Sequence, residues 1–123
     1  MKTLATQRSL KKLRREGWQC AIVEKWLPAR GGMKFGIRQD VWKFADILAC
    51  REGCPQDPES EIALIQTFPM ARWKDHAEKL AAIPELQYWK KCGGLVFMHG
   101  WAFKPKDGIR GAKKTWQVRV EQL

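Results

Sequence analysis

Short apolar stretches, separated by turns that contain glycine and proline, run along most of this 123-residue chain. Residues 61–68 are nearly all apolar, which predicts a central strand covered on both faces. Residues 45–50 predict its neighbour, and residues 18–27 and 95–103 have the apolar and β-favouring composition of two further strands. Residues 115–120 alternate between apolar and polar side chains, which predicts a half-exposed strand at a sheet edge.

Three other segments have the spacing of amphipathic helices, and they cover residues 3–16, 70–83 and 84–92. Gly17 follows the first and the pair Gly93-Gly94 follows the last, as expected for helix C-terminal caps. This order of elements predicts an α/β fold with a central mixed sheet of about 4–5 strands flanked by helices. Because the chain has no linker or internal repeat, we expect a single domain over residues 1–123.

Positive charge is in excess, with 23 Lys and Arg residues against 13 Asp and Glu and a formal net charge of +10. Such a chain attracts polyanions, of which nucleic acid is the commonest in a cell. The same charge also fits a solvated surface or attraction to an anionic membrane. No apolar run approaches the ~20 residues of a bilayer-spanning helix and no signal peptide is visible. We therefore expect a cytoplasmic protein with no membrane partner, whose four cysteines are free thiols.

Two polar residues interrupt the predicted buried strands. Asp46 stands at the head of one strand, where a carboxylate is costly to bury unless it is paired or ligated. Gln66 lies near the end of the next strand, and an amide oxygen can ligate Mg²⁺ weakly. The ordinary alternatives are that Asp46 accepts hydrogen bonds from a turn or pairs with Arg38, and that the backbone satisfies Gln66.

Further candidates flank these two strands. Glu24, on the first predicted strand, can face the same cleft as a further acid, or simply be an exposed strand residue. Lys74, on the helix that follows residue 69, can reach back to stabilise negative charge on a reacting phosphate. The alternative for Lys74 is a solvated helix face. His99 is expected to be a hydrogen-bonded strand histidine rather than a ligand.

Basic residues gather in the first helix and in the segment 104–114, which we expect to be a loop. Ten basic residues are expected to be exposed and able to contact phosphates. They are Arg8, Lys11, Lys12, Arg15, Arg38, Lys43, Lys104, Lys106, Arg110 and Lys113. Trp42, Trp101 and Trp116 can stack on bases. Seven tryptophans in so small a domain must also fill a core, so most are expected to be buried.

The pattern resembles a known family. It comprises Glu24 in Val-Glu-Lys-Trp, Asp46 at the head of one strand, Gln66 on the next, and a helix with Gln87-Tyr88 before a strand that contains His99-Gly100-Trp101. These residues resemble the PD-(D/E)XK nuclease fold, and in particular its small resolvase-like members in phages and prophages. The resemblance implies a restriction-endonuclease-like core of the form α-β-β-β-α-β.

The resemblance also implies roles for single residues. Asp46 matches the metal-binding Asp of the family, Gln66 matches the Glu-or-Gln position, and Glu24 is a match to the upstream acid. Phe68 stands where the family has a Lys, so a helix cation such as Lys74 has taken over or catalysis is lost.

The implied function is a DNA endonuclease that depends on Mg²⁺ or Mn²⁺. The alternative is a catalytically inactive module that binds DNA or a host protein complex, as a phage accessory protein would. Resolvase-like relatives act as dimers on branched DNA, which makes a homodimer an expectation of the resemblance alone.

Overall fold

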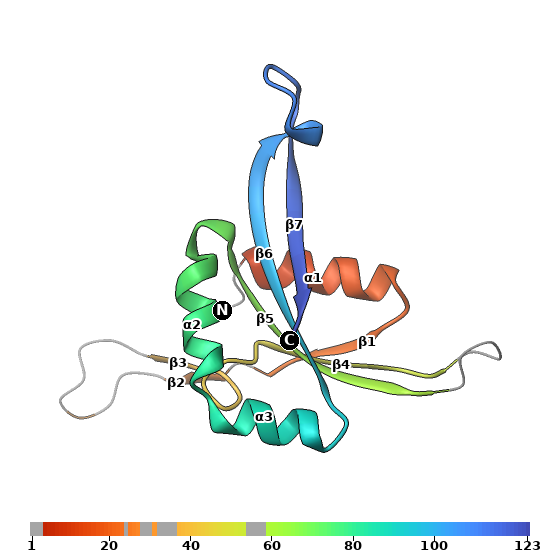
Figure 1. Ribbon diagram of the computed structural model, residues 1–123, viewed down its shortest axis with the longest axis vertical. Helices are drawn as coiled ribbons and strands as arrows, with labels where there is room; N and C mark the ends of the chain where they lie inside the picture. The colour runs from red at the N-terminus through yellow and green to blue at the C-terminus, as the bar shows by residue number, and fades with distance from the viewer. Residues whose placement is uncertain (1–3, 24, 28–30, 32–36, 54–58) are drawn as a thin grey trace.

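The computed structural model describes residues 4–23, 25–27, 31, 37–53 and 59–123. Its centre is a five-stranded sheet with helices on both faces (Figure 1). Helix α1 (Leu4–Arg15) packs on one face, and helices α2 (Trp73–Ala81) and α3 (Pro84–Lys91) pack on the other. The predicted α/β class, with helices flanking a central mixed sheet, is therefore confirmed. Among the described residues, no helix is both long and apolar enough to cross a bilayer.

The strands of the sheet follow the order β1 (Gln19–Ile22), β4 (Ile47–Arg51), β5 (Glu61–Pro69), β6 (Leu95–Pro105) and β7 (Lys114–Gln122). Strands β5 and β6 run parallel, and the other neighbouring pairs are antiparallel. A parallel pair needs a long crossover, which the 3-10 turn η1 (Met70–Arg72), α2 and α3 supply here. As predicted, β5 is central and β7 is an edge strand.

The prediction of one strand over residues 18–27 is wrong. Strand β1 ends at Ile22, and β2 (Lys25–Leu27) pairs instead with β3 (Ile37–Gln39) in a separate antiparallel ribbon. The reason is tertiary, because the register of β1 reaches the first residue of β4 at the pair Ile22–Ile47 and then has no further partner strand. One last backbone bond, from the Val23 N–H to the Asp46 carbonyl, closes the ladder.

Two apolar cores lie on the two faces of the sheet, and β5 contributes alternate residues to each. Leu64 and Phe68 pack with the α2 and α3 side, whereas Ala63 and Ile65 pack with Leu10 on the α1 side. This alternation follows from the two-residue period of a strand. Burial of each large apolar side chain stabilises the fold by roughly 1.5–3 kcal/mol. Because β5 contributes such side chains to both cores, it stabilises the packing of both helical layers.

Strands β6 and β7 form a long hairpin that extends beyond the helices (Figure 1). The pairing runs out to Pro105 and Lys114, so the predicted loop over 104–114 is shortened by strand residues at both ends. The Gln117 amide donates to the Lys104 and Pro105 carbonyls at 3.2 and 2.9 Å, which supports this extension. The turn itself passes through the left-handed region at Asp107, Gly108 and Gly111.

Candidate active site

A cavity of about 470 Å³, lined by both apolar and polar side chains, lies where α1 begins, β5 ends and α2 passes over the sheet. Apolar walls come from residues such as Phe68, Pro69 and Trp101. The polar lining is formed by Arg8, Asp40, Asp46, Gln66, Thr67, His76 and Lys79. The two principal sequence candidates, Asp46 and Gln66, therefore meet in one place.

Asp46 is fixed in this cavity by its neighbour strand. Its backbone N–H donates to the Ile65 carbonyl at 2.9 Å, and its Oδ2 accepts from the Thr67 N–H at 2.7 Å and the Thr67 hydroxyl at 3.2 Å. Since that hydroxyl proton is used, the Thr6 hydroxyl donates to Thr67 Oγ1 at 2.9 Å. The hydrogen-bonded alternative for Asp46 thus applies, although the donor belongs to β5 rather than to a turn.

Three buried polar atoms in the lining lack a hydrogen-bond partner within the part of the chain that the structure describes. They are Gln66 Oε1, Asp40 Oδ1 and His76 Nδ1. Gln66 is only 2% exposed, so the backbone does not satisfy its amide oxygen as the ordinary alternative required. An unsatisfied buried polar atom costs about 1–3 kcal/mol. Three of them around one cavity favour a site that receives a polar ligand.

Two cations approach the cavity from opposite helical layers, Arg8 from α1 and Lys79 from α2. Lys74 is exposed on α2 and is not among the residues that line the cavity. The helix explains the difference, since residues 76 and 79 are three apart and share a face, whereas residue 74 lies on another. Lys79 was missed by sequence reasoning, and its spacing from His76 was the available signal.

His76 lies flat on Phe68, with ring centroids 4.3 Å apart and planes 7° from parallel. Burial lowers the pKa of His76 below its ordinary value of 6.5, and the positive charges of Lys79 and Arg72 lower it further. The imidazole is therefore neutral at pH 7. Phe68, at the position where the resemblance places a lysine, is 2% exposed and acts as a packing surface for this histidine.

The cavity offers carboxylate and amide oxygens from Asp40, Asp46 and Gln66, the donor type that Mg²⁺ prefers. Within residues 4–23, 25–27, 31, 37–53 and 59–123, no three His, Cys, Asp or Glu side chains are grouped as a metal site. Glu24, the third predicted ligand, lies outside the described residues. A metal site here would thus depend on the Gln66 amide.

Most of the predicted phosphate-binding residues are exposed. Lys11 and Arg15 are exposed on α1, and Lys43 is exposed in the turn before β4. Four more are exposed on the β6–β7 hairpin, namely Lys104, Lys106, Arg110 and Lys113. The side chain of Arg38 is outside the described part of the structure.

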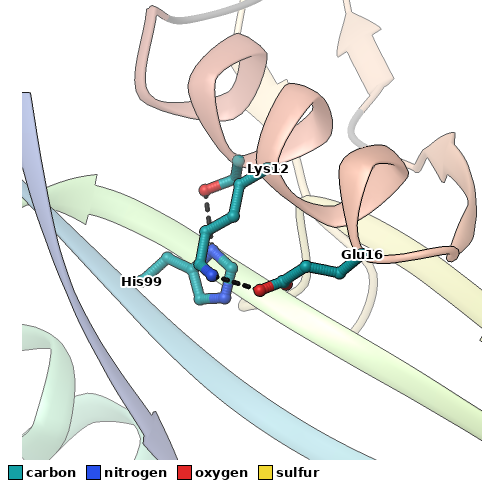
Figure 2. Close-up of polar contacts among 4 residues, drawn as sticks. Lys12, Glu16 and His99 are labelled. Carbon is teal, nitrogen blue, oxygen red and sulfur yellow. Dashed lines mark hydrogen bonds and ion pairs between the residues drawn. The ribbon is translucent and has the colours of Figure 1, made fainter.

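Arg8 and Lys12 are engaged with other side chains. The Arg8 guanidinium lies 3.3 Å from the centroid of the Trp116 ring. Lys12 forms an ion pair with Glu16 at 2.6 Å, which partly neutralises it (Figure 2).

A second cavity, of about 340 Å³, lies beneath α1 beside His99. The Ser9 hydroxyl lies 2.9 Å from His99 Nδ1 and accepts a hydrogen bond from Trp101 Nε1 at 2.8 Å, which confirms the prediction of a hydrogen-bonded strand histidine. The pKa of His99 is lowered to about 4, mainly by burial and further by the positive charge of nearby Lys12, while Glu16 opposes the shift (Figure 2). His99 is thus neutral at physiological pH.

The chain matches no family model, no curated protein and no solved structure.

Proposed function

We propose that this protein binds nucleic acid, with a preference for DNA, and hydrolyses it as a divalent-metal-dependent endonuclease. The observation that carries the proposal is the meeting of Asp46, Gln66 and Asp40 in one cavity between the cations Arg8 and Lys79. Oxygen ligands beside two cations suit a phosphodiester, which carries negative charge and gains more of it during hydrolysis. The formal net charge of +10 supports a polyanionic substrate.

In this proposal Asp46 and Gln66 hold Mg²⁺ or Mn²⁺, with Glu24 as a further ligand. The ion, when bound, would lower the pKa of water and neutralise charge on the phosphate. The Thr67 hydrogen bonds to Oδ2 hold the Asp46 carboxylate in a fixed orientation at the cavity. Arg8 and Lys79 bind phosphate oxygens and thereby position the backbone.

His76 has the properties of a proton acceptor in the same cavity. It is neutral at pH 7 because its pKa is lowered, and its buried Nδ1 has no partner among the described residues. In the tautomer that carries its proton on Nε2, Nδ1 can take a proton from water. The flat contact with Phe68 fixes the ring plane and hence the direction of that lone pair.

A second candidate is a non-catalytic module that binds DNA or a host protein complex. It is favoured by Phe68, which is buried at the position where the resemblance places a lysine.

A cleavage assay separates the two. Wild type, Asp46→Asn, Gln66→Leu and the control Lys90→Ala, which alters an exposed α3 cation, are incubated with labelled single-stranded, duplex and branched DNA. Each reaction contains Mg²⁺, Mn²⁺ or EDTA, and binding is measured in parallel. Metal-dependent cutting that survives Lys90→Ala and is lost in the other two variants supports the nuclease. Binding without cutting under every condition supports the second candidate.

A further inference from the structure

The part of the β6–β7 hairpin between Phe103 and Trp116, here called the arm, projects away from the three-layered body (Figure 1). Its two ends face each other in the antiparallel register, since Phe103 pairs with Trp116. Side chains of such a pair lie on the same face of the hairpin. The arm therefore begins at an aromatic pair.

This aromatic pair is open to solvent. The two rings are 5.2 Å apart between centroids, and the residues are 53% and 47% exposed. Arg8 lies over the indole of Trp116 with its guanidinium carbon 3.3 Å from the ring centroid, which holds that side chain in place. Large exposed aromatic rings on a protruding element are typical of interaction surfaces.

Positive charge surrounds the pair. Residues 103–116 contain five Lys and Arg residues and a single acid, Asp107. The five cations are all exposed, and they are Lys104, Lys106, Arg110, Lys113 and Lys114. A partner that supplies both negative charge and flat apolar surfaces complements this combination, and nucleic acid with unpaired bases has both.

The pair is continuous with the candidate active site. Trp101 lines that cavity, and it lies two residues before Phe103, on the same face of β6. Arg8 contacts Trp116 and also lines the cavity. An aromatic and cationic path thus leads from the arm to Asp46.

We propose that the arm binds single-stranded or unpaired nucleic acid, with bases stacked on Phe103 and Trp116 and phosphates held by the surrounding lysines and Arg110. This proposal extends the proposed function. It depends on the binding of nucleic acid but not on cleavage. Bases of an intact duplex are stacked on one another and present no free face, so the two aromatic rings can select unpaired regions. The strand held there would enter the cavity past Arg8 and Trp101.

The test is a binding measurement in EDTA, so that no cleavage is needed and failure of the nuclease proposal cannot hide the result. Fluorescence anisotropy is recorded with labelled oligothymidylate of about 15 nucleotides, long enough for several stacked bases, and with a blunt duplex of equal length. Variants are Trp116→Ala, Phe103→Ala and Trp116→Phe, each checked by thermal unfolding. Tyr88→Ala is the matched control, since Tyr88 is an aromatic residue of α3 that is 72% exposed.

Each alanine variant is expected to bind the single strand about tenfold more weakly while changing duplex affinity by less than about twofold. Trp116→Phe should recover most of the lost affinity, and Tyr88→Ala should leave it unchanged. The proposal is overturned if wild type prefers the duplex, or if folded Trp116→Ala and Phe103→Ala bind the single strand like wild type. It is also overturned if the protein self-associates and Trp116→Ala abolishes that association, because the pair then contacts a second copy of the chain.

Discussion

Thr67 donates two hydrogen bonds to one carboxylate oxygen of Asp46, from its backbone N–H at 2.7 Å and from its hydroxyl at 3.2 Å. The same hydroxyl lies 2.9 Å from that of Thr6, so the start of α1, the end of β5 and the residue before β4 meet at one buried point. Charge-assisted hydrogen bonds of this kind are stronger than neutral ones. The orientation of Asp46 is therefore part of the packing of α1 on the sheet.

We expect Thr67→Val to lower the free energy of unfolding by about 1–3 kcal/mol, because Asp46 and Thr6 lose a buried partner while the side-chain volume is nearly kept. Urea unfolding followed by circular dichroism measures this. Thr115→Val, on the hairpin, is the control and should change stability by less than about 0.5 kcal/mol. Equal stability of Thr67→Val and wild type would show that the buried hydroxyl pair contributes nothing.

Stability should fall in mild acid because of His99. Its pKa in the folded protein is about 4, below the ordinary value of 6.5, so the unfolded chain binds the proton more tightly. The stabilisation that His99 provides is thus full above about pH 6.5 and is lost as the pH falls towards 4. Between pH 7 and pH 5 we expect a loss of about 2 kcal/mol from this residue.

The comparison is between wild type and His99→Gln, unfolded in urea at both pH values. The glutamine variant is expected to be less stable at pH 7 and to show a smaller drop on acidification, since His76 and the carboxylates remain. Parallel pH profiles for the two proteins would contradict the assignment to His99.

If the cavity is the reacting site, the two lysines of α2 should differ. Lys79→Ala is expected to reduce the cleavage rate about 10²-fold or more, the usual scale for one lost charge-stabilising contact. Lys74→Ala should leave the rate within about twofold, because Lys74 is exposed and does not line the cavity. The measurement is the single-turnover rate with saturating protein. A larger loss of rate in Lys74→Ala than in Lys79→Ala would indicate that Lys74 stabilises the reacting phosphate, as the sequence suggested.

Salt dependence should separate the basic surfaces. Replacing Lys104, Lys106 and Lys113 by Gln is expected to flatten the slope of log affinity for single-stranded DNA against log salt by about 0.7 for each lost contact. Lys12→Gln should change that slope less, since Lys12 is already paired with Glu16 at 2.6 Å. Anisotropy titrations at several salt concentrations give both slopes. A larger change in slope for Lys12→Gln than for the hairpin replacements would indicate that α1 contacts the phosphates instead.

The central strand was predictable because its apolar composition indicates burial on both faces. Residues 61–68 are nearly all apolar and occupy the centre of the sheet as β5. The break between β1 and β2 was not, since no local signal separates Ile22 from Lys25 and only the end of the register with β4 explains it. Strand existence is thus a local property here, whereas strand pairing depends on distant residues.

The candidate site follows the same division. Asp46 and Gln66 stood out as polar residues in apolar strands, and they line one cavity. Lys79 and Thr67 did not stand out, because a lysine on an amphipathic helix and a threonine in a strand are ordinary. Their importance depends on helix rotation and on which face of β5 meets α1, and both are set by packing rather than by the local sequence.

The bond between Ser9 and His99 joins residues 90 positions apart, from the first helix to the fourth strand of the sheet. At synthesis rates of about 5–20 residues per second, α1 leaves the ribosome several seconds before β6. During that interval Ser9 lacks His99 and Trp101, and the wall that Trp101 gives to the cavity has not been made. The nascent chain consequently carries the basic residues of α1 several seconds before its cavity, which is complete only when Trp101 of β6 has emerged.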